Sequence, residues 1–130
     1  MKIVFDSNII ISAFIAHGCQ KDVFALAVEK ADIIISDYIL HEVRDKLVAK
    51  LKFSSSDACL VVDFLQRSTR RVTPSENIVV DFPDARDIPI LQLAAESNAR
   101  YLVTGDKALL KRKKCKKTRI ITAREALKYL

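Results

Sequence analysis

The chain has 130 residues, half of them hydrophobic, with two Gly and three Pro, a composition that excludes a disordered or fibrous protein and suits one domain. No apolar run reaches the roughly 20 residues of a membrane helix, and no secretion signal precedes the first apolar run, so we expect a cytoplasmic protein. The net charge of +6 is uneven, because residues 1–65 carry seven basic and nine acidic side chains and residues 66–130 carry fifteen and seven. The basic run KRKKCKK at 111–117 indicates either a polyanionic partner or a solvated loop.

In chain order, the sequence predicts strands that alternate with helices. The expected elements are a strand at Lys2–Phe5, a helix over 22–30, a strand at Ile33–Ile35, helices over 37–51 and 54–68, a short strand near Val79 and Val80, a helix over 88–99, strands at Tyr101–Thr104 and Arg119–Thr122, and a helix over 123–129. Such alternation predicts an α/β fold with three layers, α/β/α, around a central, mostly parallel sheet of four to five strands. We expect one domain over residues 1–130. The three cysteines lack the spacing of a zinc or redox motif and are expected to be free thiols.

Four acidic residues are expected at one edge of this sheet. In a parallel α/β fold, the C-terminal ends of the strands and the N-terminal ends of the helices share an edge. Asp6 ends the first strand and Asp106 follows the strand at 101–104. Asp87 lies where a helix begins, and Glu42 lies about a turn and a half into its helix. Each alone is better explained as a helix cap or a surface residue.

Four carboxylates from four separate segments favour a metal site over four independent caps. Close carboxylates repel one another unless a cation lies among them. Ligand sets that offer only oxygen suit Mg²⁺ or Mn²⁺. An acidic metal site on a protein with a basic half is typical of a nuclease, because the metal neutralises a phosphodiester while basic side chains bind the flanking phosphates. Lys107, together with Lys111, Arg112, Lys113 and Lys114, is a candidate for phosphate binding.

Three segments resemble the PIN-domain family, small metal-dependent ribonucleases that are often the toxins of toxin–antitoxin pairs. IVFDSNIIISAF is similar to the family's opening strand with its Asp and Asn, and SDYILHEV to its Ser-to-Glu helix start. DARDIPILQLAAESNARYLVTGDKALL resembles the most characteristic stretch, which ends in Thr-Gly-Asp. The resemblance implies an endoribonuclease that leaves 5′-phosphate and 3′-hydroxyl ends, with RNA as substrate, Mg²⁺ or Mn²⁺ as cofactor, an antitoxin protein as a possible partner, a homodimer and no membrane.

Carried over position by position, the resemblance also implies roles for individual residues. The catalytic and metal-binding quartet would be Asp6, Glu42, Asp87 and Asp106. Asn8 and Thr104 would support the site by hydrogen bonding, and Asp84 would mainly cap the helix that carries Asp87.

Two positions depart from the family pattern. Ala108 stands where many members have a further acid, so no metal role is expected there. Pro89 is compatible only with a first helical turn, so this helix must begin irregularly or close to Asp87.

Three other interpretations stay open from the sequence. The chain could be a catalytically inactive RNA-binding module of the same fold. It could be a phosphohydrolase or a receiver domain, although Asn8 stands where an aspartyl-phosphate phosphatase would have a second Asp. Finally, it could be an α/β domain whose acids only cap helices, which predicts no stabilisation by metal.

Overall fold

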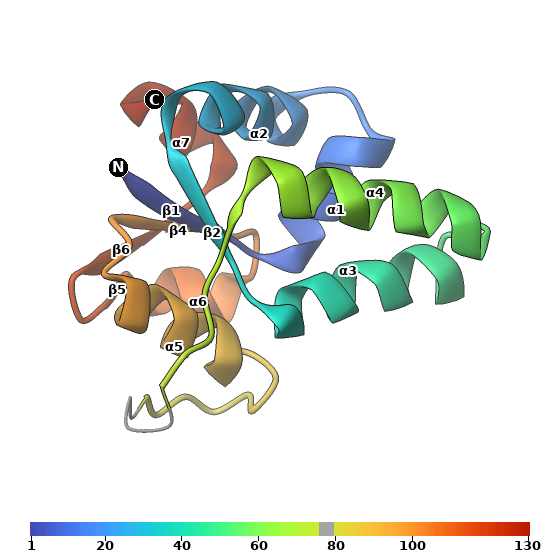
Figure 1. Cartoon of the computed structure of the whole chain (residues 1–130). Helices are drawn as coiled ribbons and strands as arrows, with labels where there is room; N and C mark the ends of the chain where they lie inside the picture. The colour runs from blue at the N-terminus through green and yellow to red at the C-terminus, as the bar shows by residue number, and fades with distance from the viewer. Residues whose placement is uncertain (76–79) are drawn as a thin grey trace.

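The computed structural model describes residues 1–75 and 80–130, which form an α/β fold around a six-stranded sheet (Figure 1). The strand order is β3-β2-β1-β4-β6-β5. The strands are β1 (Lys2–Phe5), β2 (Asp32–Ile35), β3 (Arg70–Arg71), β4 (Tyr101–Val103), β5 (Lys114–Cys115) and β6 (Thr118–Ile121). All neighbours pair in parallel except β5 with β6, which are antiparallel. The mostly parallel α/β fold expected from the sequence is confirmed, with two-residue strands added at both edges.

Helices cover both faces of the sheet. They are α1 (Ser7–Ile15), α2 (Cys19–Lys30), α3 (Asp37–Ala49), α4 (Ser55–Ser68), α5 (Ile88–Ser97), α6 (Lys107–Arg112) and α7 (Ala123–Tyr129). In Figure 1, α5 and α6 lie on one side of the sheet and α2 and α7 on the other, while α3 and α4 pack side by side and extend away from the strands. Within the described residues, no single helix could cross a membrane; only α1 and α2 together, bent by 103°, have the length and composition.

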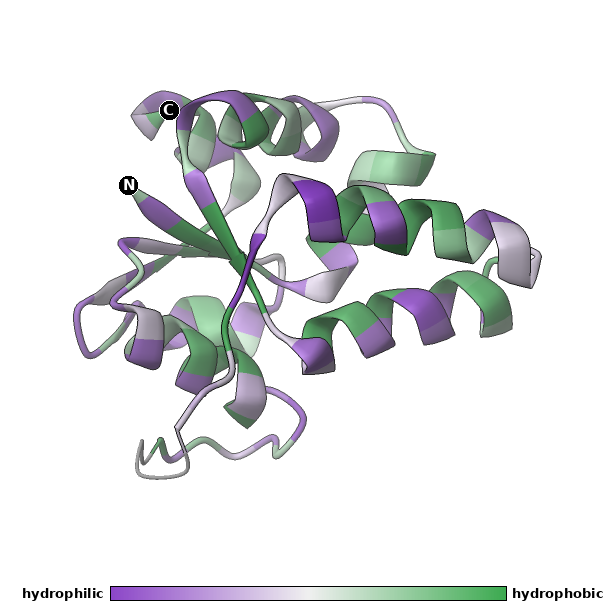
Figure 2. Ribbon diagram, viewed as in Figure 1, coloured by the Kyte–Doolittle hydropathy of each residue, from purple (hydrophilic) through white to green (hydrophobic). Residues whose placement is uncertain are grey.

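The three central strands are the core of the protein. Residues 3–5, 33–35 and 101–103 are all at most 5% exposed, because helices cover the sheet on both sides. Figure 2 shows these strands as a hydrophobic band between helices whose outer faces are polar. Strands buried on both faces need continuous apolar sequences rather than alternating ones, and IVF, III and YLV meet that requirement.

Two helices and two short strands were not predicted from the sequence. Helix α1 begins one residue after β1, and its apolar run of Ile9–Ile11 is entirely buried, so it lacks the polar face that reveals a surface helix. Helix α6 has only six residues. The basic run at 111–117, for which a solvated loop was one of two interpretations, includes the end of α6, the strand β5 and the turn before β6. Of the predicted strand near 79–80, Val79 lies outside the described residues, and Val80 belongs to no strand.

The start of α5 corrects one expectation from the sequence. Asp84 does not cap this helix: its Oδ1 accepts a hydrogen bond from the backbone N–H of Arg86 (2.9 Å) and so stabilises the preceding turn. The helix begins at Ile88, which makes Pro89 its second residue. A proline is tolerated there because the first N–H groups of a helix have no partner within it. The helix therefore begins close to Asp87, one of the two alternatives that Pro89 allowed.

Candidate functional site

The site lies at the carboxyl edge of the sheet, where strand order reverses around β1. The chain runs from β1 to β2 and β3 on one side and then crosses to β4 on the other side of β1, and open α/β sheets bind ligands at such a point. The parallel register pairs Phe5 with Val103, so the next residues, Asp6 and Thr104, are neighbours. The Thr104 hydroxyl donates to Asp6 Oδ2 (2.7 Å) and accepts from the backbone N–H of Asp106 (3.0 Å). Because Asp6 and Thr104 are buried, this arrangement holds the Asp6 carboxylate firmly.

Three of the acids occupy the position directly before a helix, yet only one of them caps its helix. Asp106 Oδ1 accepts from the backbone N–H groups of Ala108 (2.8 Å) and Leu109 (3.1 Å), as an ordinary N-cap does. Asp6 before α1 and Asp87 before α5 make no side-chain capping bond. A capping bond is worth about 1 kcal/mol. The carboxylates of Asp6 and Asp87 do not make this bond and line a pocket instead, so helix capping does not explain why acidic residues occupy these two positions.

Glu42 approaches the same edge from α3. The N-cap of α3, Ser36, accepts from the backbone N–H of Ile39 (3.3 Å) and starts the helix directly after β2. One and a half turns later, Glu42 Oε1 accepts from the hydroxyl of Ser7 (3.0 Å). The Lys46 ammonium lies 4.0 Å from Glu42 Oε2. Glu42 thus has a hydroxyl donor and a cation as close partners.

Lys46 connects Glu42 to the start of α1. Its Nζ donates to the hydroxyl of Ser7 (3.2 Å) and to Oδ1 of Asn8 (3.1 Å). Asn8 was predicted to support the site by hydrogen bonding, and its partner in the structure is this lysine rather than one of the four acids.

The loop before α5 forms the opposite wall of the site. The Arg86 guanidinium donates to both carboxylate oxygens of Asp84 (3.3 and 3.1 Å), and these bonds hold the pKa of Asp84 below its usual range. The Tyr38 hydroxyl at the start of α3 donates to the backbone carbonyl of Arg86 (3.0 Å) and ties the loop to that helix. Burial, followed by the nearby Glu42 carboxylate, raises the pKa of Tyr38, so this phenol remains a donor at neutral pH.

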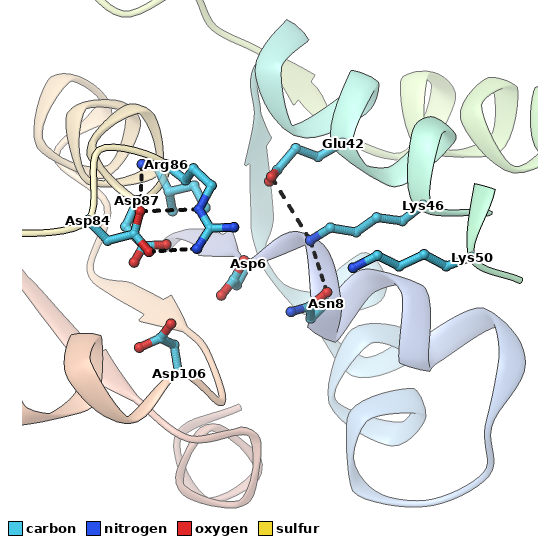
Figure 3. Close-up of a pocket in the computed structure, with 10 residues that line it drawn as sticks. Asp6, Asn8, Glu42, Lys46, Lys50, Asp84, Arg86, Asp87 and Asp106 are labelled. Carbon is cyan, nitrogen blue, oxygen red and sulfur yellow. Dashed lines mark hydrogen bonds and ion pairs between the residues drawn. The ribbon is translucent and has the colours of Figure 1, made fainter. Parts of the chain in front are cut away.

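All four predicted acids line one pocket of about 230 Å³. Figure 3 shows Asp6 near its centre, the Asp84–Asp87 loop on one side, Glu42 with Lys46 and Asn8 on the other, and Asp106 below. The complete lining is Asp6, Asn8, Glu42, Lys46, Lys50, Asp84, Arg86, Asp87, Ile90 and Asp106. The structure therefore brings together the quartet, Asn8 and Asp84. Thr104 lies directly behind the pocket, bonded to Asp6.

The electrostatics of the pocket are most evident at Asp87. Its pKa is raised to about 6, first by burial and then by the negative charges of Asp106, Asp84 and Asp6; Arg86 acts in the opposite direction. A carboxylate that ionises against three like charges is stabilised by any cation that enters the pocket.

These features fit a divalent metal by the chemistry of the donor set. The acids of the pocket supply oxygen ligands alone, as Mg²⁺ and Mn²⁺ prefer, and Asp87 shows that their charges are not fully compensated. Within the residues that the structure describes, no three acidic, His or Cys side chains already converge as a set of metal ligands. The site is thus an acidic pocket with suitable donors rather than a preformed metal cage.

Sequence reasoning missed the cationic side of the pocket, which consists of Lys46, Lys50 and Arg86. The spacing contains a signal for two of them, because positions 42, 46 and 50 follow one another at i, i+4 and i+8 on a single helix face. Ser7, the buried donor to Glu42, is likewise absent from the site residues that the sequence predicts.

None of the five basic residues predicted to bind phosphate lines this pocket. Four of them are exposed: Lys107, Lys111, Lys113 and Lys114. Arg112 has structural contacts instead: its guanidinium donates to the backbone carbonyls of Asp81 (2.6 Å) and Lys114 (3.3 Å) and lies over the ring of Phe82. A role of this basic surface in RNA binding stays a prediction.

The bond between Thr104 and Asp6 leads to a first test. Replacing Thr104 by valine keeps the shape but removes the donor to Asp6 and the acceptor of the Asp106 N–H. We expect the free energy of unfolding in urea to fall by about 1–3 kcal/mol, because buried polar groups lose their partners. Thr118→Val is the matched control, since Thr118 is equally buried but bonds only to backbone carbonyls. Only Thr104→Val should also weaken the rise in melting temperature caused by Mn²⁺, and equal responses in the two variants would contradict this role.

Comparisons with known proteins identify the family of the chain. A family model described as the PIN domain matches residues 2–108, so the chain belongs to the PIN-domain family, whose members are typically nucleases that use a divalent metal. A search of curated proteins finds no match.

Two solved structures share the fold. A chain of VapBC2 from Rickettsia felis, solved bound to a DNA fragment from their promoter, superposes with a TM-score of 0.68 and 17% identity, over 94% of this chain and 98% of that one. A chain of VapBC-1 from nontypeable Haemophilus influenzae gives a TM-score of 0.68 and 14% identity, over 95% of this chain and 99% of that one. At these identities, the likeness shows the fold alone.

Proposed function

We propose that this protein is a metal-dependent endoribonuclease and the toxin of a toxin–antitoxin pair. The observation that carries the proposal is the placement of Asp6 and Asp87, which stand before helices without capping them and line one pocket with Glu42 and Asp106. Placing these carboxylates close together destabilises their ionised forms, as the raised pKa of Asp87 indicates. Perturbed pKa values of this kind are typical of functional sites, and a bound metal would stabilise the ionised carboxylates.

The residues of the pocket would have different roles in phosphodiester hydrolysis. Asp6, Glu42, Asp87 and Asp106 would hold Mg²⁺ or Mn²⁺, and Thr104 fixes the orientation of Asp6. When bound, the metal would lower the pKa of a coordinated water and stabilise charge on the phosphate. The Lys50 Nζ has no hydrogen-bond or ion-pair partner in the described part of the chain, so it is available to a phosphate of the substrate. Single-stranded or looped RNA is the expected target, because the major groove of A-form RNA is too narrow to read.

The toxin assignment rests on the fold. The two solved structures described above are chains of VapBC assemblies, and the sequence resembles a family whose members are often toxins of this kind. An antitoxin protein is therefore the partner we propose for this chain. Homodimerisation and a cytoplasmic location stay predictions.

The test is the cleavage of a mixed RNA pool by the purified protein with Mn²⁺ or Mg²⁺ and with EDTA. We expect cleavage with metal, none with EDTA, and ligatable 5′-phosphate ends on the products. Tight RNA binding without cleavage under either metal would instead favour an inactive RNA-binding module. Absence of both cleavage and binding would contradict the proposed function.

A further inference from the structure

The charges in the pocket are paired unevenly. Lys46 is an internal partner of Glu42: its side chain is only 25% exposed, and its Nζ is within hydrogen-bonding distance of Ser7 Oγ and Asn8 Oδ1 and 4.0 Å from Glu42 Oε2. A lysine held by three groups of the protein is fixed in place, unlike a solvated surface lysine. One part of the pocket thus has a built-in positive charge.

The other part has no such partner. Asp6 accepts a hydrogen bond from the neutral hydroxyl of Thr104, and Asp106 accepts hydrogen bonds from backbone N–H groups. In the described part of the chain, neither carboxylate has an ion pair, and neither does Asp87. The remaining acid of the pocket, Asp84, is neutralised by Arg86.

The balance of charge agrees with this division. Five carboxylates and three cationic side chains line the pocket, which leaves a charge of −2 when all are ionised. A single divalent cation would compensate that charge. A second would leave an excess of positive charge and would have to enter beside the ammonium of Lys46.

We propose that Lys46 takes the place of a second cation by neutralising Glu42, so that the pocket holds one divalent ion, at Asp6, Asp87 and Asp106. Lys46 is then a positioning residue, which orients Glu42 and Asn8 and sets the number of ions bound. This inference rests on the proposed metal-dependent function and narrows it, because only three of the four acids would then hold metal, as a single ion, while Glu42 is neutralised by Lys46.

The experiment is a calorimetric titration of the metal-stripped full chain with Mn²⁺. We expect one ion per chain for the wild type and two for Lys46→Met, because the methionine keeps the apolar stem but frees Glu42. Lys46→Arg keeps the positive charge and should bind one ion. Lys50→Met is the matched control: it removes an equal charge from the same pocket, one helical turn further on, without freeing Glu42, and should also bind one.

A double variant tests whether the second ion depends on Glu42. Glu42→Gln combined with Lys46→Met should return to one ion per chain. If Lys46→Met does not fold, as judged by its melting curve, Lys46→Gln removes the same charge and keeps a hydrogen-bond donor.

The outcomes separate this inference from the proposed function. Two ions in the wild type, or one ion in both neutral variants of Lys46, would overturn the role of Lys46 and leave the metal-dependent nuclease in place. Two ions in Lys50→Met would show that net charge, rather than the pairing with Glu42, sets the number bound. Failure of the wild type to bind Mn²⁺ at all would overturn the metal-dependent function itself, and the inference with it.

Discussion

Replacing Asp6 by asparagine is expected to abolish metal-dependent RNA cleavage while the protein stays folded. Asp6 is only 7% exposed, lies at the end of β1 beside β4 and accepts a hydrogen bond from the Thr104 hydroxyl, so its carboxylate is firmly held. Asparagine has nearly the same shape and can still accept that bond, but it lacks the charge that holds a metal. Changes to residues that merely orient a metal ligand cost about 10–100-fold. The loss of the ligand itself should therefore exceed about a hundredfold in cleavage rate.

The measurement is the initial rate of cleavage of one defined RNA with Mn²⁺, together with a melting curve of each variant. Asp45→Asn is a matched control, because Asp45 is an exposed acid of α3 that does not line the pocket. It should cleave at the wild-type rate. Wild-type cleavage by Asp6→Asn would exclude Asp6 from the site, and a drop in both variants would indicate a general effect of lost negative charge.

Replacing Asp87 by asparagine is expected to stabilise the metal-free protein at neutral pH while weakening its response to metal. The pKa of Asp87 is raised to about 6 in the folded chain, against about 3.9 in an unfolded one. A raised pKa means that the folded state holds the proton more tightly, so the stabilising contribution is complete below about pH 4 and is lost as the pH rises through about 6. Solvent screens part of this effect, so we expect a gain of about 1–2 kcal/mol for Asp87→Asn at pH 7.

Denaturant unfolding in EDTA at pH 4 and pH 7 measures this difference. The advantage of Asp87→Asn should be present at pH 7 and largely lost at pH 4, where the wild-type carboxyl is protonated in the folded state and about half protonated in the unfolded state. Asp84→Asn serves as the opposite control, because its bonds to Arg86 lower the pKa of Asp84, and the substitution should not stabilise. Added Mn²⁺ should raise the melting temperature of the wild type more than that of Asp87→Asn. An Asp87→Asn variant no more stable than the wild type at pH 7 would contradict the crowding of charge in the pocket.

The strands and the site edge could be predicted because they depend on strong local patterns and a topological rule. Runs such as III at 33–35 indicate strands buried on both faces, and the shared edge of a parallel fold brings Asp6 and Asp106 together without knowledge of any distance. Helix α1 could not be predicted in this way. Its Ile9–Ile11 run is buried all round, so the sequence lacks the polar face by which a helix is recognised.

The contacts of Lys46 with α1 were also beyond sequence reasoning. The i, i+4 spacing can indicate that Lys46 lies beside Glu42, but the contacts of Lys46 with Ser7 and Asn8 depend on how far α3 lies from α1, a packing distance that no local pattern contains. The role of Asp84 likewise depends on a turn rather than on a helix start, and only the path of the backbone decides between them. Helix ends were predictable to within a few residues, whereas side-chain partners across elements were not.

The position of β1 at the centre of the sheet has a consequence for how the protein is made. Its two neighbours, β2 and β4, come from opposite halves of the sequence, and the bond between Thr104 and Asp6 spans 98 residues. Such long-range pairing folds slowly, because the chain must close large loops before contacts repay the lost entropy. During synthesis, the acidic edge stays incomplete until the segment that carries Asp106 has left the ribosome. The nuclease that we propose would therefore be inactive until this segment has been synthesised, and a proposed antitoxin would not be needed before then.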